Sequence, residues 1–521
     1  MNQSSEVKSN NKWIIGIVGT GTMGMGIAQV AASAGHLVFL YDARPGIAQL
    51  AIEQIGDSLK KQVIKGRLEQ AAQELMVQHL KPIDHLQALA KVDLVIEAIS
   101  EDLESKQNLF KDLEALVGPS TILASNTSSI SITAIANGLS NPKRLIGMHF
   151  FNPVPLMQLV EVVLGAQTDQ FVADIITQLA RSWGKTAVQA KSTPGFIVNR
   201  VARPFYAEAL ALLQERACIP EQIDQALRDI GFRMGPCELM DLIGHDVNYS
   251  VTSSMFDANY GDRRYVPSIV QKALVDGGRL GRKSQMGFYA YSAGSMIQAT
   301  DSGLEEEMHS HEMAHEVTIT LVGSSSLVDC LGKLLKRAEV PYAEDPQANW
   351  QGLRISELDL MMTDGRSATQ VAAQTGKQSL GVIDFPLIVS SGGYLAISFA
   401  PTVPQKDRSI TALVMKKYGI HLMEIADTPG LIVGRTIAML INEAADAVQQ
   451  GVSDKASIDT AMQLGTSYPM GPFAWLEMIG IQAIVVILNH LFEAYRSDRY
   501  RISILLQKDY YTDQISNLKN F

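Results

Sequence analysis

Three glycines stand where an apolar run gives way to a helical stretch. Gly19, Gly21 and Gly24 are spaced G-x-G-x-x-G, directly after the apolar run Ile14–Val18. In such a turn the first glycine permits a sharp bend, the second lets a pyrophosphate approach the backbone, and the third lets the helix pack closely on the strand. Free N–H groups at the helix N-terminus then attract the phosphates. The spacing therefore predicts a site for a dinucleotide.

An acidic residue after the next apolar run favours one dinucleotide over another. Asp42 lies 23 residues after Gly19, close to the spacing of about 20 at which a carboxylate accepts the hydroxyls of the adenosine ribose. Thr22 and Met23 open the helix on which the phosphates would rest. The carboxylate would repel a 2′-phosphate, so the pattern predicts NAD, although Arg44 could pair with a phosphate and leaves tolerance of NADP open. Three glycines in an ordinary turn are the alternative.

Apolar runs alternate with helical stretches up to about residue 192. Strands are predicted at 92–98, 121–125 and 144–150, a helix at 102–116, and a helical hairpin at 45–79. Strands that alternate with helices form a parallel sheet covered on both faces, and ligands bind at the carboxyl ends of its strands. The pattern predicts a Rossmann fold with its site at that edge, where three polar clusters fall: residues 19–24, 100–101 and 125–129.

A helical segment occurs twice in the chain. Thr193–Arg200 (TPGFIVNR) returns as Thr428–Arg435 (TPGLIVGR), and Met234-Gly235-Pro236 returns as Met470-Gly471-Pro472. The offset is 235 residues at the first match and 236 at the second. Ordered matches with a single slip predict a duplicated unit.

The segment between the two copies has an α/β pattern without a glycine fingerprint. Strands are predicted at Val317–Val322, Leu358–Met362, Leu387–Ser390 and Tyr394–Phe399, which suggests a reduced Rossmann-like domain with no evident nucleotide site. The predicted fold class is α/β plus all-α. Its segments are a disordered tail (1–12), a Rossmann domain (13–192), helical copy 1 (193–291), a linker (292–314), the reduced Rossmann-like domain (315–410) and helical copy 2 (411–521).

Four motifs together resemble one enzyme family. These are SNTSS at 125–129, HFFNPVP at 149–155, TPGFIVNR at 193–200 and GRKSQMGFYAY at 281–291. With the glycine fingerprint they resemble the 3-hydroxyacyl-CoA dehydrogenases over residues 13–291. The second half is similar to the longer bacterial 3-hydroxybutyryl-CoA and 3-hydroxyadipyl-CoA dehydrogenases. The resemblance implies NAD-dependent oxidation of (S)-3-hydroxyacyl-CoA to 3-oxoacyl-CoA, in fatty-acid β-oxidation or phenylacetate catabolism.

The resemblance implies a catalytic His149–Glu161 pair, with Ser128 and Asn199 binding the substrate. Imidazole suits the reaction because its ordinary pKa near 6.5 keeps both protonation states accessible. A carboxylate on the second ring nitrogen would fix the tautomer and stabilise the imidazolium. Each residue has a structural alternative: His149 in a core beside two phenylalanines, Glu161 as a strand-edge carboxylate, and Ser128 and Asn199 as helix caps.

The resemblance also implies contacts for two ligands. For NAD it points to the glycine loop, Asp42, Glu101, Lys106, Ser128, Asn152 and Lys283. For coenzyme A it points to Ser58, Lys65, Lys106, Ser128 and Asn199. The second copy departs from the pattern, because Gly434 stands where Asn199 stands in the first, so one active site per chain is expected.

Composition narrows the class further. The net charge is −10 with no basic run, which argues against nucleic acid or a membrane surface. Three cysteines and no metal-ligand spacing predict no disulfide framework and no metal, and the polar residues 1–12 do not read as a secretory signal, so a cytoplasmic protein is expected.

Several alternatives stay open from sequence. A dehydrogenase of small hydroxy acids and a non-catalytic NAD-binding relative are the rival functions. A dicarboxyl substrate would need a cation near its acyl end, for which Arg203 and Arg233 are candidates. The chain is expected either to form a homo-oligomer or to pack its two helical copies as a pseudo-dimer within one chain.

Overall fold

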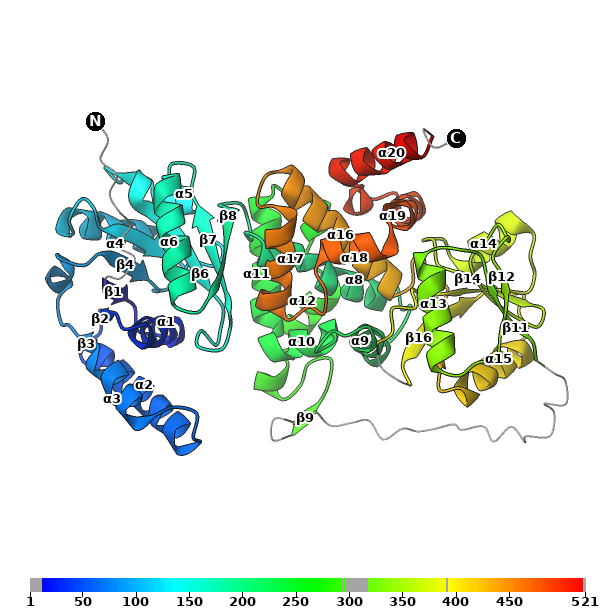
Figure 1. The fold of residues 1–521 in the computed structure, drawn as a ribbon, viewed down its shortest axis with the longest axis horizontal. Coiled ribbons are helices and arrows are strands. Elements are labelled where there is room, and N and C mark those ends of the chain that lie inside the picture. Colours follow the sequence, from blue (N-terminus) through cyan, green and yellow to red (C-terminus); the bar gives the residue numbers. More distant parts are fainter. Residues whose placement is uncertain (1–11, 293–294, 297–316, 390–391, 519–521) are drawn as a thin grey trace. The chain divides into compact units, whose positions relative to one another are not determined.

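The computed structural model describes residues 12–292, 295–296, 317–389 and 392–518. The chain divides into two compact units (Figure 1): residues 1–200 with 450–466, and residues 201–449 with 467–521. The predicted tail, apart from Lys12, and most of the predicted linker lie outside the described residues.

The first unit is built on an eight-stranded sheet of order β3-β2-β1-β4-β5-β6-β7-β8. All neighbouring strands are parallel except β6 and β7, which are antiparallel. The Rossmann fold predicted from the alternation of apolar and helical runs is confirmed. The strands are β1 Ile14–Val18, β2 Leu37–Tyr41, β3 Leu80–Pro82, β4 Leu94–Glu97, β5 Ile122–Ser125, β6 Leu145–Phe150, β7 Leu159–Leu164 and β8 Thr186–Lys191.

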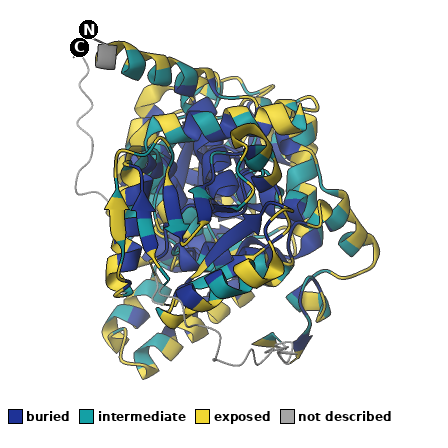
Figure 2. Ribbon diagram, turned by 90° about the vertical axis from the view of Figure 1, so that its right-hand side faces the viewer, coloured by how far each residue is buried: buried dark blue, intermediate teal, exposed yellow. Residues whose placement is uncertain are grey.

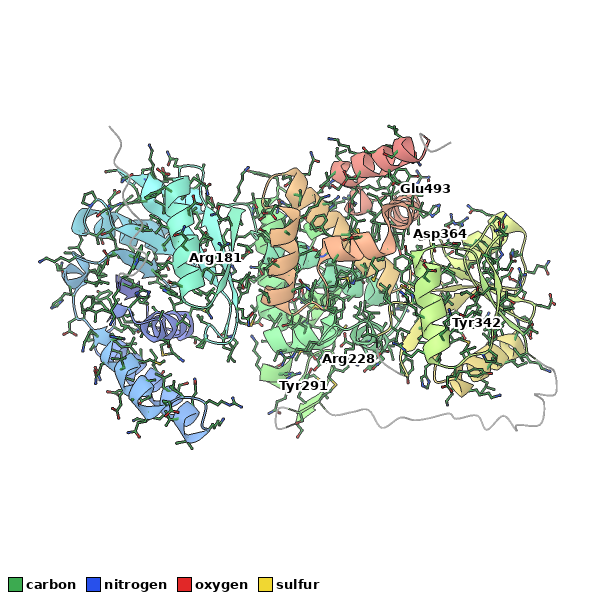
Figure 3. The ribbon with its side chains drawn as sticks, viewed as in Figure 1. Arg181, Arg228, Tyr291, Tyr342, Asp364 and Glu493 are labelled. Atoms are coloured by element: carbon green, nitrogen blue, oxygen red, sulfur yellow. The ribbon has the colours of Figure 1, made fainter. Side chains whose placement is uncertain are left out.

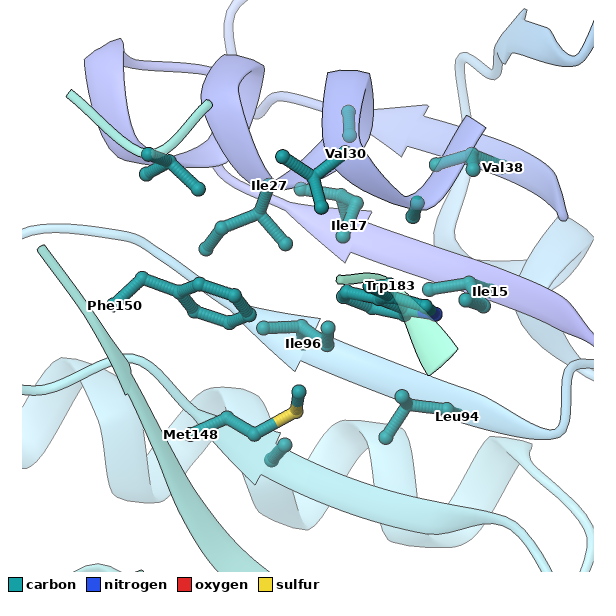
Figure 4. Packing of buried hydrophobic residues seen from close by; sticks show 14 of the residues in the cluster. Ile15, Ile17, Ile27, Val30, Val38, Leu94, Ile96, Met148, Phe150 and Trp183 are labelled. Atoms are coloured by element: carbon teal, nitrogen blue, oxygen red, sulfur yellow. The ribbon is translucent and has the colours of Figure 1, made fainter. Parts of the chain in front are cut away.

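Helices cover both faces of this sheet because its strands are apolar on both sides. In the layer shown in Figure 4, Ile27 and Val30 of α1 pack over Ile15 and Ile17 of β1, next to Trp183. The predicted hairpin is present as α2 and α3. The helices of this unit are α1 Thr22–Ser33, α2 Ile47–Ile64, α3 Gln70–Gln78, α4 Leu103–Leu116, α5 Ile132–Ile135, α6 Gln170–Ser182, α7 Val198–Val201 and α17 Lys455–Thr466.

The second unit contains helical elements from both copies of the repeat. Copy 1 supplies α8 Arg203–Gln214, α9 Pro220–Asp229, α10 Pro236–Ile243, α11 His245–Ala258 and α12 Ile269–Asp276. Copy 2 supplies α16 Val433–Gln449, α18 Pro472–Ile479, α19 Ile481–Tyr495 and α20 Ile504–Leu518. Both copies begin with the same backbone: Gly195 and Gly430 have φ of 76° and 77°, and the next residues, Phe196 and Leu431, have φ of 49° and 52°.

A second sheet completes this unit, with order β12-β11-β13-β14-β15-β16-β17. Figure 2 shows the central strands of this sheet as mostly buried and the outer faces of its helices as exposed, while the edge strands β12 and β17 are partly exposed. The strands are β11 Ile319–Val322, β12 Ala343–Asp345, β13 Gly352–Ile355, β14 Leu358–Met362, β15 Leu380–Ile383, β16 Tyr394–Phe399 and β17 His421–Glu424; the helices are α13 Ser326–Arg337, α14 Ala368–Thr375 and α15 Gln405–Lys417.

Two sequence predictions fail in this sheet. No strand forms in the described part of Leu387–Ser390. The strand of this region is β15, which ends at Ile383, and the chain then leaves the sheet at Asp384-Phe385-Pro386. The predicted boundary at residue 410 falls inside α15, and the sheet continues to β17. The domain therefore extends to about residue 424.

Within the described residues, no single helix is long and apolar enough to cross a membrane. The helices α18 and α19 reach the required length and composition only as a pair, and they meet at an angle of 103°.

Candidate active site

His149 and Glu161 face each other across two antiparallel strands. His149 lies on β6 and Glu161 on β7, and the two residues are direct partners in the register of these strands. The His149 Nδ1 atom is 2.6 Å from Glu161 Oε2, and the side chains are 7% and 0% exposed. An isolated carboxylate would be costly at this depth, so the imidazole is its natural partner. The pairing that the family resemblance implied is present.

The second oxygen of Glu161 holds the start of α7. Glu161 Oε1 accepts the backbone N–H groups of Ile197 at 2.9 Å and Val198 at 3.0 Å. The imidazole of His149 packs on the ring of Phe151, with centroids 4.5 Å apart, and near the ring of Phe196 at 5.8 Å. Because its Nδ1 is engaged by Glu161, Nε2 is the ring atom left for exchanging a proton with a substrate.

Ser128 and Asn199 lie together near this pair. The Asn199 amide nitrogen is 3.4 Å from the Ser128 carbonyl oxygen. Glu101 organises the same turn, because its Oε1 accepts the Thr127 hydroxyl at 2.6 Å and the Ser128 N–H at 2.9 Å. Although burial alone would raise the pKa of Glu101, the Thr127 hydroxyl and the Lys106 ammonium lower it. The cap of α5 is Ser131, so the capping alternative for Ser128 is wrong.

The glycine loop fits a dinucleotide. Gly19 and Gly24 are required by the protein itself: a Cβ on Gly24 would lie 1.9 Å from the Gly19 carbonyl oxygen, and one on Gly19 would lie 2.6 Å from the Ala98 carbonyl oxygen. A Cβ on Gly21 would meet no atom within 4 Å. Gly21 is therefore not explained by internal packing, and the open space beside it at the N-terminus of α1 suits a pyrophosphate.

Asp42 is held ready at the end of β2. Its carboxylate accepts the Thr20 hydroxyl at 2.9 Å and the Arg44 Nε–H at 3.0 Å. Burial works against ionisation, but the contacts with Arg44 and Thr20 outweigh it and lower the pKa of Asp42 to about 2. Arg44 is thus engaged by Asp42 in this structure, and the carboxylate stays charged at the position expected for the ribose hydroxyls.

Lys106 is buried between two carboxylates, whereas a contact with a phosphate needs an accessible ammonium. Its side chain is 1% exposed, and its Nζ lies 2.5 Å from Glu97 Oε1 and 3.3 Å from Glu101 Oε2. Glu97 also accepts the Ser125 hydroxyl at 2.6 Å. Lys106 therefore fixes the two carboxylates at the strand ends. Glu97 was not predicted as a site residue, although a glutamate near the end of the apolar run VDLVIEA was a signal for it.

The remaining predicted ligand residues are dispersed. Asn152 is exposed in the loop after β6, and Ser58 and Lys65 are exposed on the hairpin, on α2 and just after it. Lys283 belongs to the second unit, where its Nζ is 2.7 Å from Asp246 Oδ2. The segment that carries Lys283 ends at Tyr291, labelled in Figure 3.

No group of three histidine, cysteine, aspartate or glutamate side chains in the described parts of the chain could hold a metal ion. The histidines at 309, 311 and 315 lie outside the described residues.

Family models cover most of the sequence. The NAD-binding domain of 3-hydroxyacyl-CoA dehydrogenase matches residues 14–193, and the C-terminal domain of the same family matches residues 195–291 and again 430–517. The reduced Rossmann-fold domain of 3-hydroxybutyryl-CoA dehydrogenase matches residues 360–429. The chain belongs to the 3-hydroxyacyl-CoA dehydrogenase family. It is an NAD-dependent oxidoreductase, as the sequence predicted.

Relatives at full and half length agree with this assignment. The chain is 42% identical to the 3-hydroxyadipyl-CoA dehydrogenase of Escherichia coli K12, over 96% of this chain and 97% of the relative. A crystal structure of 3-hydroxybutyryl-CoA dehydrogenase from E. coli K12 matches with a TM-score of 0.83 and 42% identity, over 96% of this chain and 98% of that one. The (S)-3-hydroxybutyryl-CoA dehydrogenase of Ralstonia eutropha matches over 54% of this chain and 100% of its own, with 37% identity and a TM-score of 0.53.

Proposed function

We propose that the chain interconverts (S)-3-hydroxyacyl-CoA and 3-oxoacyl-CoA, with His149 as the acid–base group. When bound, NAD supplies the acceptor for the hydride leaving C3 of the substrate. His149 Nε2 takes the hydroxyl proton in oxidation and returns it in reduction. The observation that carries the proposal is the 2.6 Å contact between His149 and the fully buried Glu161.

Glu161 acts through the imidazole and through the backbone. It holds the Nδ1–H tautomer, which leaves Nε2 as the basic atom, and it stabilises the imidazolium after proton transfer. Because the same carboxylate binds the N–H groups of Ile197 and Val198, it also holds the turn that carries Asn199.

Ser128 and Asn199 position the substrate oxygens in this proposal. The hydrogen bond that the Asn199 side-chain amide donates to the Ser128 carbonyl oxygen, at 3.4 Å, supports this proposal because it holds the two residues next to each other. Holding C3 in a reactive orientation contributes several kcal/mol to catalysis. Ser58 and Lys65, exposed on the α2–α3 hairpin, are proposed to contact coenzyme A.

The test is the reverse reaction, acetoacetyl-CoA with NADH, followed by the loss of NADH absorbance. We expect turnover that His149→Gln reduces by about 10²–10⁴-fold, the range for a positioned acid–base group. Turnover with free acetoacetate in place of its coenzyme A ester would instead favour a dehydrogenase of small acids. The fatty-acid and phenylacetate pathways stay predictions of the resemblance, and a cytoplasmic location stays a prediction of the sequence composition.

We further propose that the two helical copies form a pseudo-dimer within one chain. In the first unit the N–H of Lys191 donates to the carbonyl of Val452 at 2.9 Å, and in the second unit the N–H of Ala426 donates to the carbonyl of Ala217 at 2.9 Å. The two bonds are related by the repeat offset of 235 residues, with the copies exchanged. Each copy thus makes to the other the contact that it receives, the exchange expected of a dimer-like pairing of copies.

Buried ion pairs follow the same exchange. Arg264 of copy 1 pairs with Glu443 of copy 2, with Nη1 and Oε2 3.3 Å apart, and Arg499 of copy 2 pairs with Glu208 of copy 1 at 2.8 Å. The molecular mass in solution tests the proposal, and a particle of one chain, 56.8 kDa, is expected. If particles of several chains form, mutations at these ion pairs should leave the number of chains per particle unchanged.

A further inference from the structure

Glu97, the last residue of β4, is a fully buried carboxylate with every contact on its own side of the sheet edge. Its Oε1 lies 2.5 Å from the Lys106 ammonium and accepts the Ile99 N–H at 2.7 Å. Its Oε2 accepts the Ser125 hydroxyl at 2.6 Å. Because Lys106 belongs to α4 and Ser125 ends β5, one side chain joins two strand ends to a helix.

A first route leads from Glu97 to Ser128 through charged groups. The Lys106 ammonium, which touches Glu97 on one side, is 3.3 Å from Glu101 Oε2 on the other. The second oxygen of Glu101 accepts the Ser128 N–H at 2.9 Å and the Ser128 hydroxyl at 3.3 Å. The orientation of Glu101 therefore depends on where Glu97 holds the ammonium, and the position of Ser128 depends on Glu101.

A second route leads to the same turn through hydroxyl groups. The Ser125 hydroxyl, whose proton goes to Glu97, accepts the Thr127 N–H at 3.2 Å. The Thr127 hydroxyl donates to Glu101 Oε1 at 2.6 Å. The two routes therefore meet at one carboxylate beneath the turn, and both begin at Glu97.

The second sheet has uncharged residues at the matching place. In the first sheet Ser125 pairs with Glu97 on one side and with the glycine of β6 on the other. The residue 235 positions after that glycine is Val382, which pairs with Met361, and Met361 pairs with Gly352 on β13, which runs antiparallel. A sheet can thus be built here without ions, and a buried ion pair seldom stabilises more than apolar packing. Stability alone does not explain the network.

We propose that Glu97 is a positioning residue for Ser128. It acts through the Lys106–Glu101 pair and through the hydroxyl groups of the turn after β5. The inference rests on the proposed function, in which Ser128 binds a substrate oxygen. Glu97 itself meets neither substrate nor cofactor in this account: it supplies one fixed geometry, and a displacement of about 1 Å at a reacting centre can lower a rate by about a hundredfold.

A double-mutant cycle tests the proposal, with kcat/KM for acetoacetyl-CoA measured at saturating NADH. Glu97→Gln keeps the size of the side chain and removes its charge, so the Lys106 ammonium should turn towards Glu101 and draw it away from Ser128. Alone, this substitution should lower kcat/KM by about ten- to a hundredfold. In a Ser128→Ala background it should lower kcat/KM by less than about threefold, because the hydroxyl that it displaces is already absent. A carboxylate with a purely structural role would give equal factors in both backgrounds.

Glu114→Gln is the matched control. Glu114 lies on α4, the helix of Lys106, and its carboxylate accepts the N–H groups of Ser140 and Asn141 at 2.6 Å and 2.9 Å. It therefore holds backbone N–H groups from the same helix, but at a different loop. Its replacement should leave kcat/KM per folded molecule unchanged, with and without Ser128→Ala.

If Glu97→Gln does not fold, Ser125→Ala carries the same cycle, because it removes the hydroxyl between Glu97 and the Thr127 N–H. Its single effect should be smaller and should again shrink in the Ser128→Ala background. Equal factors in the two backgrounds, or a wild-type value of kcat/KM in Glu97→Gln, would overturn the inference. Failure of the proposed function would look different: the wild-type enzyme would not turn over acetoacetyl-CoA, and the inference would fall with it.

Discussion

The two halves of the chain hold the start of their repeated helical segment with different residues. In the first half, Glu161 on β7 binds the N–H groups of Ile197 and Val198 and also pairs with His149 on β6. In the second half, the counterpart of His149 is Asp384 and the counterpart of Glu161 is Ala396. The Asp384 N–H donates to the Ala396 carbonyl at 2.9 Å.

Asp384 provides the backbone contacts that Glu161 provides in the first half, without a histidine partner. Its carboxylate accepts the N–H groups of Ile432 at 2.9 Å, Val433 at 2.7 Å and Gly434 at 2.8 Å. The first two are the counterparts of Ile197 and Val198. A carboxylate under this turn is therefore common to both halves, whereas the imidazole is confined to one. The comparison separates what the fold needs from what the proposed chemistry needs.

A second contrast concerns the helices. In copy 1, Asp241 accepts the N–H groups of Phe288 and Tyr289 and the Tyr291 hydroxyl, and it lies 2.7 Å from His245 Nε2. A Cβ on Gly287 would lie 1.9 Å from Asp241 Oδ1. In copy 2 the counterpart of His245 is Ile481, and 281–291 has no counterpart within the described residues. Asp241 thus anchors the segment that carries Lys283.

The largest effect should come from removing the negative charge of Glu161. Glu161→Gln keeps the size of the side chain but offers the imidazole a neutral partner, so kcat should fall by about 10²–10⁴-fold. Affinity for NADH, measured by fluorescence titration, should change little because the glycine loop is untouched. Near-normal turnover would show that the pair has no role in catalysis.

Glu208→Gln should be the most destabilising change among the inter-copy contacts. The carboxylate is buried between Arg435 and Arg499, and breaking a buried pair on one side costs about 3–5 kcal/mol. Urea unfolding measures the loss. Glu443→Gln removes the acceptor of the contact related by the repeat and should also lower the free energy of unfolding; an unchanged urea midpoint in Glu208→Gln would contradict the role given to this buried pair.

Asp384→Ala should reduce stability and leave catalysis intact. Three helix N–H groups lose their acceptor, and an unsatisfied buried donor costs about 1–3 kcal/mol. The free energy of unfolding should therefore fall by at least that amount, while kcat per folded molecule stays at the wild-type value. A parallel loss of kcat in fully folded protein would contradict the separation of the two halves.

The smallest effect is expected from Gly434→Asn, which restores the residue found in the first copy. A Cβ here would lie 3.0 Å from Thr363 Cγ2 and 3.1 Å from Ile487 Cδ1, so overpacking should cost about 1–3 kcal/mol. The melting temperature should fall with no gain of activity. Recovery of activity when Gly434→Asn is added to Asn199→Ala would show that the second half can still act.

Local patterns predicted the parts of the fold that local chemistry determines. The strand Ile14–Val18 was predicted at its observed bounds, because a buried parallel strand is a continuous apolar run followed by glycine. The strand predicted at 387–390 is absent from its described part, 387–389, because an apolar run in a partly buried connection has the same composition as a strand.

Site residues whose partners lie far away in the sequence could not be predicted from local patterns. The role of Asp384 depends on N–H groups almost fifty residues away, and that of Glu97 on Lys106 and Ser125, so neither stood out as a single residue. Lys106 was assigned to the two ligands from the family resemblance alone, and the structure buries its ammonium between Glu97 and Glu101, contacts that no local pattern indicates.

The position of α17 constrains how this chain could have changed over time. This helix comes from the second copy of the repeat, yet it lies in the first unit, where Gly465 packs against Leu159 and Val198, and just before it the Ser453 hydroxyl donates to the Gln189 carbonyl. A deletion of the second copy would uncover the strand that bears Glu161. If catalysis depends on Glu161 as proposed, selection for turnover also preserves this helix of the second copy, and an ancestral duplication of this kind is hard to reverse.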